Sequence, residues 1–266
     1  MERRSVAVKA EDVRATDGRF FRDMFGSKAP SHLSEACALG PYPRSCTRLS
    51  DREIRQGLNC LFKVGGLAES DLLVEEVECW RGYVRADYLC IRDGDLAVIE
   101  IKSDRDTLSR FHEQVRVYNA IADRVTLVVG WNLAAPALRI APRWWQVLLA
   151  ERELDAAPRF VTLRDGARNP TVDATAQLSM LPMADLRLLA THVGVRETIQ
   201  PRQLRELIAL RASDDDLHNA VRRWLTRISE ERRTLQSSAI RANASSRSCG
   251  APAKSFEVMG SATTNE

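Results

Sequence analysis

The stretch VRADYLCIRDGDLAVIEIKSD, residues 84–104, decides which fold this chain can adopt. Two apolar runs flank an Asp93-Gly94 pair. Such a pair strongly favours a two-residue hairpin turn, because both central residues of that turn need positive φ. The sequence therefore predicts an antiparallel hairpin over about residues 83–103. Both strands also carry charged residues, and charges are costly inside an apolar strand unless something compensates them.

The predicted turn determines which residues of the hairpin face each other. Counting outward from it gives the pairs Arg92 with Asp95, Leu89 with Val98, Tyr88 with Ile99, Asp87 with Glu100, and Arg85 with Lys102. Facing side chains lie about 4.5–5.5 Å apart at Cβ, so facing carboxylates repel. A divalent cation would turn that repulsion into coordination, since Mg²⁺ accepts one or two carboxylates with waters and phosphate oxygens. The alternative is that Asp87 and Glu100 are solvated at a sheet end, each paired with Arg85 or Lys102.

Further elements are predicted on both sides of the hairpin. Ser50 and Glu53 have capping-box spacing and begin a helix with apolar residues at helical intervals, which the Gly65-Gly66 pair ends. The remaining segments are predicted as a strand over 72–80, a helix over 106–122 capped by Asp104 or Asp106, a buried strand over 124–130, and a hairpin over 144–151 and 159–165. This order predicts an α/β fold with an α-β-β-β-α-β core and a mixed central sheet.

The chain divides into segments of different character. We predict an irregular N-terminal segment over 1–48, an α/β core over 49–170, a C-terminal helical region over 171–234 and a disordered tail over 235–266. The last helix begins with a capping box, Ser213 and Asp216, and carries one apolar stripe. Its arginine-bearing face either contacts a phosphate backbone or is a solvated surface.

Composition sets broad limits on function. The 266 residues carry a formal net charge of +3, which permits a polyanionic partner without requiring one. None of the six cysteines forms a CxxC pair, and a reducing cytoplasm is the simplest location for such a chain. No stretch is long and apolar enough to predict a membrane-spanning helix.

The charged residues of the hairpin, taken with the helix after it, resemble a known superfamily. Asp87 on one strand, Glu100-Ile101-Lys102 on the next, and Gln114 with Tyr118 on the following helix resemble the PD-(D/E)XK nucleases. Residues i and i+4 share a helix face, so Gln114 and Tyr118 can point together toward the hairpin. The fuller string RAD…EIKSDRDTLSRFHEQVRVY is similar to an uncharacterised bacterial family within that superfamily, over roughly residues 50–230. The chain departs from the superfamily pattern in lacking a Pro before Asp87.

The resemblance implies a restriction-endonuclease-like fold and a divalent-metal-dependent nuclease, with DNA favoured over RNA as the expected substrate. It implies that Asp87, Glu100 and the Ile101 carbonyl bind Mg²⁺ or Mn²⁺, and that Lys102 assists the attacking water. Gln114 and Tyr118 would orient the hairpin or touch the substrate backbone.

Three further residues are candidates for accessory or substrate-contacting roles. Glu53 either joins the metal site from the first helix or serves only its capping box. Arg85 either meets a phosphate or neutralises Asp87. Arg110 lies one turn before Gln114 on the same helix face.

A second hypothesis is a catalytically inactive protein of the same fold. Such a protein would bind nucleic acid, or a protein partner in a mobile-element or defence system. The helical C-terminal region could then serve as a lid, a homodimer interface or a docking surface.

Overall fold

A six-stranded mixed sheet forms the centre of the protein. The computed structural model describes residues 48–64, 68, 70–80, 82–152, 158–196 and 200–248. The strands are β1 (Leu72–Cys79), β2 (Val84–Arg92), β3 (Asp95–Lys102), β4 (Arg124–Val129), β5 (Gln146–Glu151) and β6 (Arg159–Arg164), and they lie in that order across the sheet. The β3–β4 and β4–β5 pairs are parallel and the others antiparallel. The predicted α/β fold with a mixed sheet is confirmed.

The hairpin formed by β2 and β3 has the predicted turn and register. Asp93 and Gly94 have φ of 50° and 86°, as the two-residue turn requires. The ladder pairs Arg92 with Asp95 and continues to Tyr88 opposite Ile99. It ends there, so the predicted pairs Asp87–Glu100 and Arg85–Lys102 are not part of the ladder. The ladder between the two strands thus ends immediately before the acidic pair, Asp87 and Glu100.

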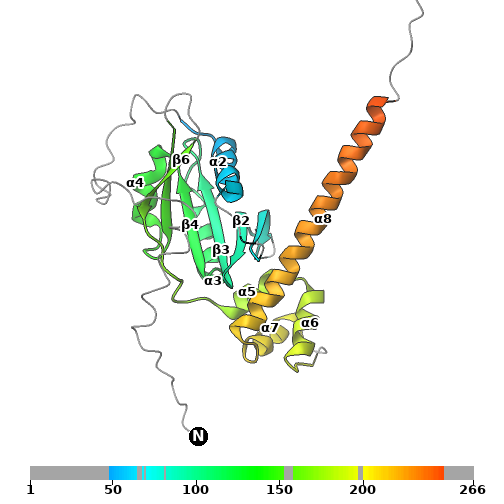
Figure 1. Cartoon of the computed structure of the whole chain (residues 1–266). Helices are drawn as coiled ribbons and strands as arrows, with labels where there is room; N and C mark the ends of the chain where they lie inside the picture. Colours follow the sequence, from blue (N-terminus) through cyan, green and yellow to red (C-terminus); the bar gives the residue numbers. More distant parts are fainter. Residues whose placement is uncertain are drawn as a thin grey trace, which may run out of the picture. The chain divides into compact units, whose positions relative to one another are not determined.

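Helix α2 (Asp51–Val64) packs on one face of the sheet (Figure 1). The Ser50 amide donates to Glu53 Oε2 at 2.8 Å and the Glu53 amide donates to Ser50 Oγ at 3.4 Å, which confirms the capping box. The buried side chains of α2 meet Ile99 and Ile101 of β3 in one apolar cluster. Gly57 permits this approach, because a Cβ there would lie 3.1 Å from the Phe160 ring. The helix ends before Gly65-Gly66, which lies outside the described residues.

Helix α3 (Phe111–Ile121) follows β3 and contacts the face of the sheet opposite to the one covered by α2. Alternation along β3 places Glu100 on the face away from the α2 cluster, where Gln114 and Tyr118 of α3 contact it. The helix begins later than predicted, because neither proposed cap residue is available. Asp106 accepts from the Ser103 amide at 2.7 Å, and Asp104 accepts from the Leu49 amide at 2.9 Å.

The segment between β4 and β5 contains a helix that sequence patterns did not predict. Helix α4 (Trp131–Ile140) contains Pro136, which removes an amide donor and argues against a helix interior. The hairpin predicted after it is confirmed as the antiparallel pair β5–β6. Trp145 packs in the core, with its indole N–H donating to Asn119 Oδ1 at 2.9 Å.

The chain after the sheet is helical, as predicted. It contains α5 (Ala174–Met180), α6 (Met183–His192), α7 (Pro201–Ala209) and α8 (Asp214–Ser248). Ser213 and Asp216 form the expected capping box, with the Ser213 amide donating to Asp216 Oδ2 at 3.0 Å. No helix in the described part of the chain is long and apolar enough to cross a membrane.

The compact units of the chain differ from the predicted segments. The first unit runs to Thr226, so it joins the sheet with α5, α6, α7 and the first turns of α8. The second unit begins at Arg227, and its described part is the remainder of α8. Helix therefore continues to Ser248, where a disordered tail from 235 was predicted. The predicted irregular segment 1–48 lies, except for its last residue, outside the described residues.

An ion pair joins the first turns of α8 to the sheet within the first unit. His218 Nε2 lies 3.0 Å from Asp123 Oδ2, which also accepts from the Leu96 amide at 2.9 Å. The hydrogen bond with Asp123 raises the pKa of His218 above its ordinary 6.5, against the effect of burial. Burial raises the pKa of Asp123, but the hydrogen bonds from His218 and Leu96 outweigh it and bring the pKa below 3.8.

These shifts predict a pH window for stability. The His218 contribution is complete below its ordinary pKa and is lost as pH rises through its raised pKa, while the Asp123 contribution is lost as pH falls through its lowered pKa. His218→Gln should lower the free energy of unfolding by about 1–3 kcal/mol near pH 5.5 and by less near pH 9. Urea denaturation at both pH values measures this, with exposed His112→Gln as control. Equal losses at both pH values would contradict the assignment.

Candidate active site

A cleft opens where β2 and β3 separate. Its volume is about 590 Å³, and its walls come from α2, β1, the turn between β1 and β2, both hairpin strands, the segment after β3, and α3. Most of the predicted site residues line it: Arg85, Asp87, Glu100, Ile101, Lys102, Arg110 and Gln114. The two acids therefore open onto one cavity, although they are not ladder partners.

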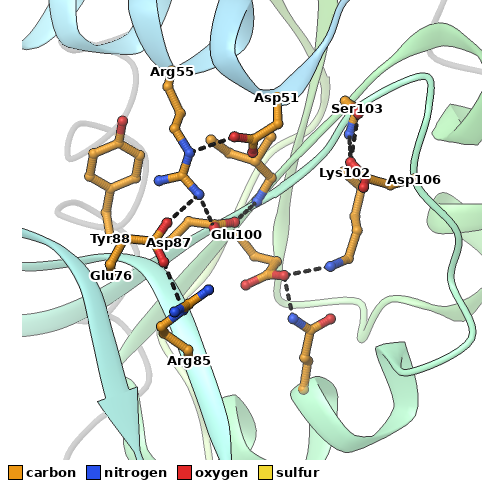
Figure 2. Close-up of polar contacts among 12 residues, drawn as sticks. Asp51, Arg55, Glu76, Arg85, Asp87, Tyr88, Glu100, Lys102, Ser103 and Asp106 are labelled. Atoms are coloured by element: carbon orange, nitrogen blue, oxygen red, sulfur yellow. Dashed lines mark hydrogen bonds and ion pairs between the residues drawn. The ribbon is translucent and has the colours of Figure 1, made fainter.

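Asp87 occupies the position at which the ladder ends. Its Oδ2 accepts a hydrogen bond from the Ile101 amide at 2.6 Å. In a continuing ladder, a backbone carbonyl of β2 would be the acceptor of that hydrogen bond. Its Oδ1 accepts from the Arg55 guanidinium of α2 (Figure 2). Burial, followed by the negative charge of Glu100, raises the pKa of Asp87 to about 7 against the opposing effects of Ile101 and Arg55. The ionised carboxylate is thus poorly compensated despite its partners.

Glu100 is buried and held by three donors. Lys102 Nζ donates to Oε1 at 2.6 Å, the Gln114 amide also donates to Oε1, and the Tyr118 hydroxyl donates to Oε2 at 2.6 Å (Figure 2 draws the lysine contact). Burial, together with the neighbouring Glu100 charge, raises the pKa of Tyr118 well above its ordinary range, so its hydroxyl remains a donor. The donors determine how the carboxylate is oriented, and the predicted convergence of Gln114 and Tyr118 on the hairpin is confirmed.

Gln114 also has a polar atom without a partner. Its Oε1 is buried and accepts no hydrogen bond from any described residue. Because a buried acceptor is costly to leave unsatisfied, the position favours a ligand or water that can donate to it. The residue lines the cleft, so such a donor would lie in the cavity beside Glu100.

Arg55 is a cleft residue that the sequence analysis did not name. Its guanidinium contacts three carboxylates: Asp51 Oδ2 at 2.7 Å, Glu76 Oε1 at 2.7 Å, and Asp87. It also lies 5.5 Å from the centroid of the Tyr88 ring. The only signal in the sequence is its i,i+4 spacing from Asp51 on a capped helix. The contacts with Glu76 and Asp87 come from two strands and depend on tertiary structure.

The accessory candidates lie partly where predicted. Arg85 does not neutralise Asp87: its Nε lies 2.7 Å from Glu76 Oε2, and its side chain is 66% exposed. Arg110 lines the cleft and precedes the first residue of α3. Glu53 lies outside the cleft lining, because its carboxylate is used by Ser50 and by Arg152, 2.8 Å away. The capping role of Glu53 is confirmed, and the structure does not bring Glu53 to the cleft wall formed by Asp87 and Glu100.

Comparison with known proteins identifies one family. The family model described as bacteriophage P4 protein cII matches residues 47–248. The chain belongs to the bacteriophage P4 protein cII family. No curated protein and no solved structure matches the chain. The matched range begins before α2 and extends to the end of α8, so the whole cleft of this P4 cII family member lies inside it.

The donor atoms at the cleft are of the type that hard divalent cations prefer. Asp87 and Glu100 line the cleft with carboxylates, and with the Ile101 carbonyl they would supply oxygen ligands, while Mg²⁺ would complete its shell with waters and phosphate oxygens. The described residues contain no group of three or more His, Cys, Asp or Glu that could hold a metal by itself. The set therefore fits an ion held by two carboxylates and by substrate. Such an ion would compete with Arg55 for Asp87.

That competition gives a prediction for Arg55→Gln. Without divalent metal, the variant should lose about 3 kcal/mol of folding free energy, because it leaves the carboxylates around Arg55 uncompensated. Mn²⁺ should raise its melting temperature more than that of the wild type, since the Asp87 carboxylate is then no longer paired with the Arg55 guanidinium. Thermal melting in chelator and in Mn²⁺ measures both effects, with the exposed Arg52→Gln on the same helix as control. Equal Mn²⁺ shifts for variant and wild type would exclude competition.

Proposed function

We propose that this member of the P4 cII family is a divalent-metal-dependent nuclease that hydrolyses phosphodiester bonds, with DNA as the expected substrate. One observation carries the proposal: Asp87, Glu100 and Lys102 open onto one cleft, beside a helix whose Gln114 and Tyr118 hold Glu100. This arrangement is what the resemblance to PD-(D/E)XK nucleases implies, and the chain order α-β-β-β-α-β agrees with it.

The roles of the acidic residues follow from their contacts. Asp87 and Glu100 would hold Mg²⁺ or Mn²⁺ together with the Ile101 carbonyl. The bound ion would lower the pKa of a water molecule and neutralise charge on the phosphate. Tyr118 and Gln114 keep Glu100 oriented toward the cleft, and the Ile101 amide keeps Asp87 beside it. The protein thus prepares the ligand positions through hydrogen bonds that need no metal.

Lys102 supplies the positive charge next to the reacting phosphate. Its ammonium lies 2.6 Å from Glu100 Oε1, its side chain is only 14% exposed, and the residue lines the cleft. From there it can position the attacking water and stabilise the negative charge that develops on the phosphate. The exposed Arg85 and Arg110 at the same cleft can contact flanking phosphates.

A second candidate is a protein of this fold that binds nucleic acid or a protein partner without cleavage. The Arg55 contacts favour it, because both site carboxylates already have cationic partners, Arg55 for Asp87 and Lys102 for Glu100. Carboxylates that already have cationic partners can persist as a structural network without metal. DNA binding with a steep salt dependence, and no cleavage with any divalent metal, would support this candidate.

The nuclease proposal predicts the behaviour of Lys102→Ala. Purified wild-type protein should nick or degrade DNA in Mg²⁺ or Mn²⁺ and not in chelator. Lys102→Ala should lower the rate about 100-fold or more, because it removes the charge that stabilises the transition state. Lys63→Ala, an exposed lysine on α2, is the matched control and should retain the wild-type rate. Gel assays on supercoiled, linear and single-stranded DNA measure the rates. Undiminished cleavage by Lys102→Ala would reject its role.

A further inference from the structure

An aromatic side chain is exposed at the edge of the cleft. Tyr83 lies in the turn between β1 and β2, lines the cleft and is 56% exposed. It is the only aromatic residue among the exposed large hydrophobic residues of the described chain. An exposed ring beside a site that would bind phosphate calls for a physical explanation.

The ring is held in place by contacts on its surface and at its hydroxyl. The guanidinium of Arg116, on α3, lies 5.6 Å from the Tyr83 ring centroid and 5.5 Å from that of Trp80. The Tyr83 hydroxyl donates to Glu113 Oε1 at 3.3 Å. One arginine thus engages two aromatic rings, and a cation near a ring face is attracted by the ring's quadrupole. Tyr83 is exposed but held, which lowers the entropy cost of binding a ligand on it.

Trp80, at the start of the turn, has a strained backbone conformation. Trp80 has φ of 49°, and its carbonyl accepts from the Tyr83 amide at 3.3 Å. Positive φ is rare for a bulky side chain and persists only where the surrounding structure compensates for it. Gly82 has φ of 81°, which a glycine adopts without strain. A turn needing only glycine at positive φ would avoid the strain, so the conformation of Trp80 favours a role for the aromatic pair.

We infer that Tyr83 is a stacking platform for an unpaired base, so that the substrate is a single strand or contains an unpaired nucleotide near the bond to be cut. The inference rests on the proposed function. A base in the interior of a duplex is stacked on both sides and cannot offer its face, whereas an unpaired base can lie on a tyrosine ring in any sequence. The adjoining Arg85 and Arg110 would contact the phosphates of the same strand.

Binding without catalysis tests the inference. The affinities of a single-stranded oligonucleotide and of a blunt duplex are measured in chelator, so that cleavage does not enter. The single strand carries the fluorescent base 2-aminopurine, whose emission falls on stacking. Tyr83→Ala should weaken single-strand binding about 10-fold and abolish the quenching. Its duplex affinity should not change. Tyr83→Phe keeps the ring and should bind within about twofold of the wild type. Melting temperatures confirm that the variants fold.

The outcomes separate this inference from the nuclease proposal. Unchanged single-strand binding by Tyr83→Ala, an equal loss in Tyr83→Phe, or no DNA binding by the wild type would overturn the platform. Metal-dependent cleavage by the wild type alongside such a result would leave the nuclease proposal standing. If the Tyr83 effects occur and the wild type cleaves no DNA with any metal, Tyr83 remains a binding site for an unpaired base, while the nuclease proposal and the substrate role inferred from it both fail.

Discussion

The hydrogen bond from the Ile101 amide to Asp87 is the interaction on which the candidate site depends. It lies where the ladder between β2 and β3 ends, one step beyond Tyr88 opposite Ile99. The Ile101 amide donates its hydrogen bond to the Asp87 carboxylate and not to a carbonyl of β2. The two strands can therefore separate there. Their separation gives the cleft its position and opens Asp87 and Glu100 onto the same cavity. A continuous ladder would have closed this end of the hairpin.

Electrostatics explain how acidic groups are tolerated so close to an apolar core. Glu100 receives three donors, and Asp87 receives the Ile101 amide and Arg55. Ion pairs at buried positions stabilise weakly, because desolvation cancels much of their attraction, and they are more informative about specificity or function. The raised pKa of Asp87, caused first by burial and then by Glu100, shows that this compensation is incomplete. A divalent cation would supply the missing positive charge, and displacing Arg55 would be the cost of admitting it.

Much of this arrangement could be predicted from local patterns in the sequence. The Asp93-Gly94 turn gave the hairpin register, and the i,i+4 spacing gave the convergence of Gln114 and Tyr118 on Glu100. The end of the ladder could not be predicted, because it depends on whether the Ile101 amide donates its hydrogen bond to a side chain or to a strand carbonyl. Arg55 was missed because its partners Glu76 and Asp87 lie on strands distant in sequence. Glu76 moreover has φ of 51°, which nothing in its strand sequence indicates. Helix α4 was not predicted because it contains Pro136, and proline is unfavourable in a helix interior.

Membership in the bacteriophage P4 protein cII family covers the whole cleft but does not by itself assign a reaction, so the account must be tested at its metal ligands. Isothermal titration calorimetry with Mn²⁺, on the wild type and on Asp87→Asn, does this without assuming a substrate. The account predicts that the wild type binds Mn²⁺ and that Asp87→Asn, folded by its melting curve, loses that binding. Equal Mn²⁺ binding by both proteins, or none by the wild type with or without added DNA, would contradict it.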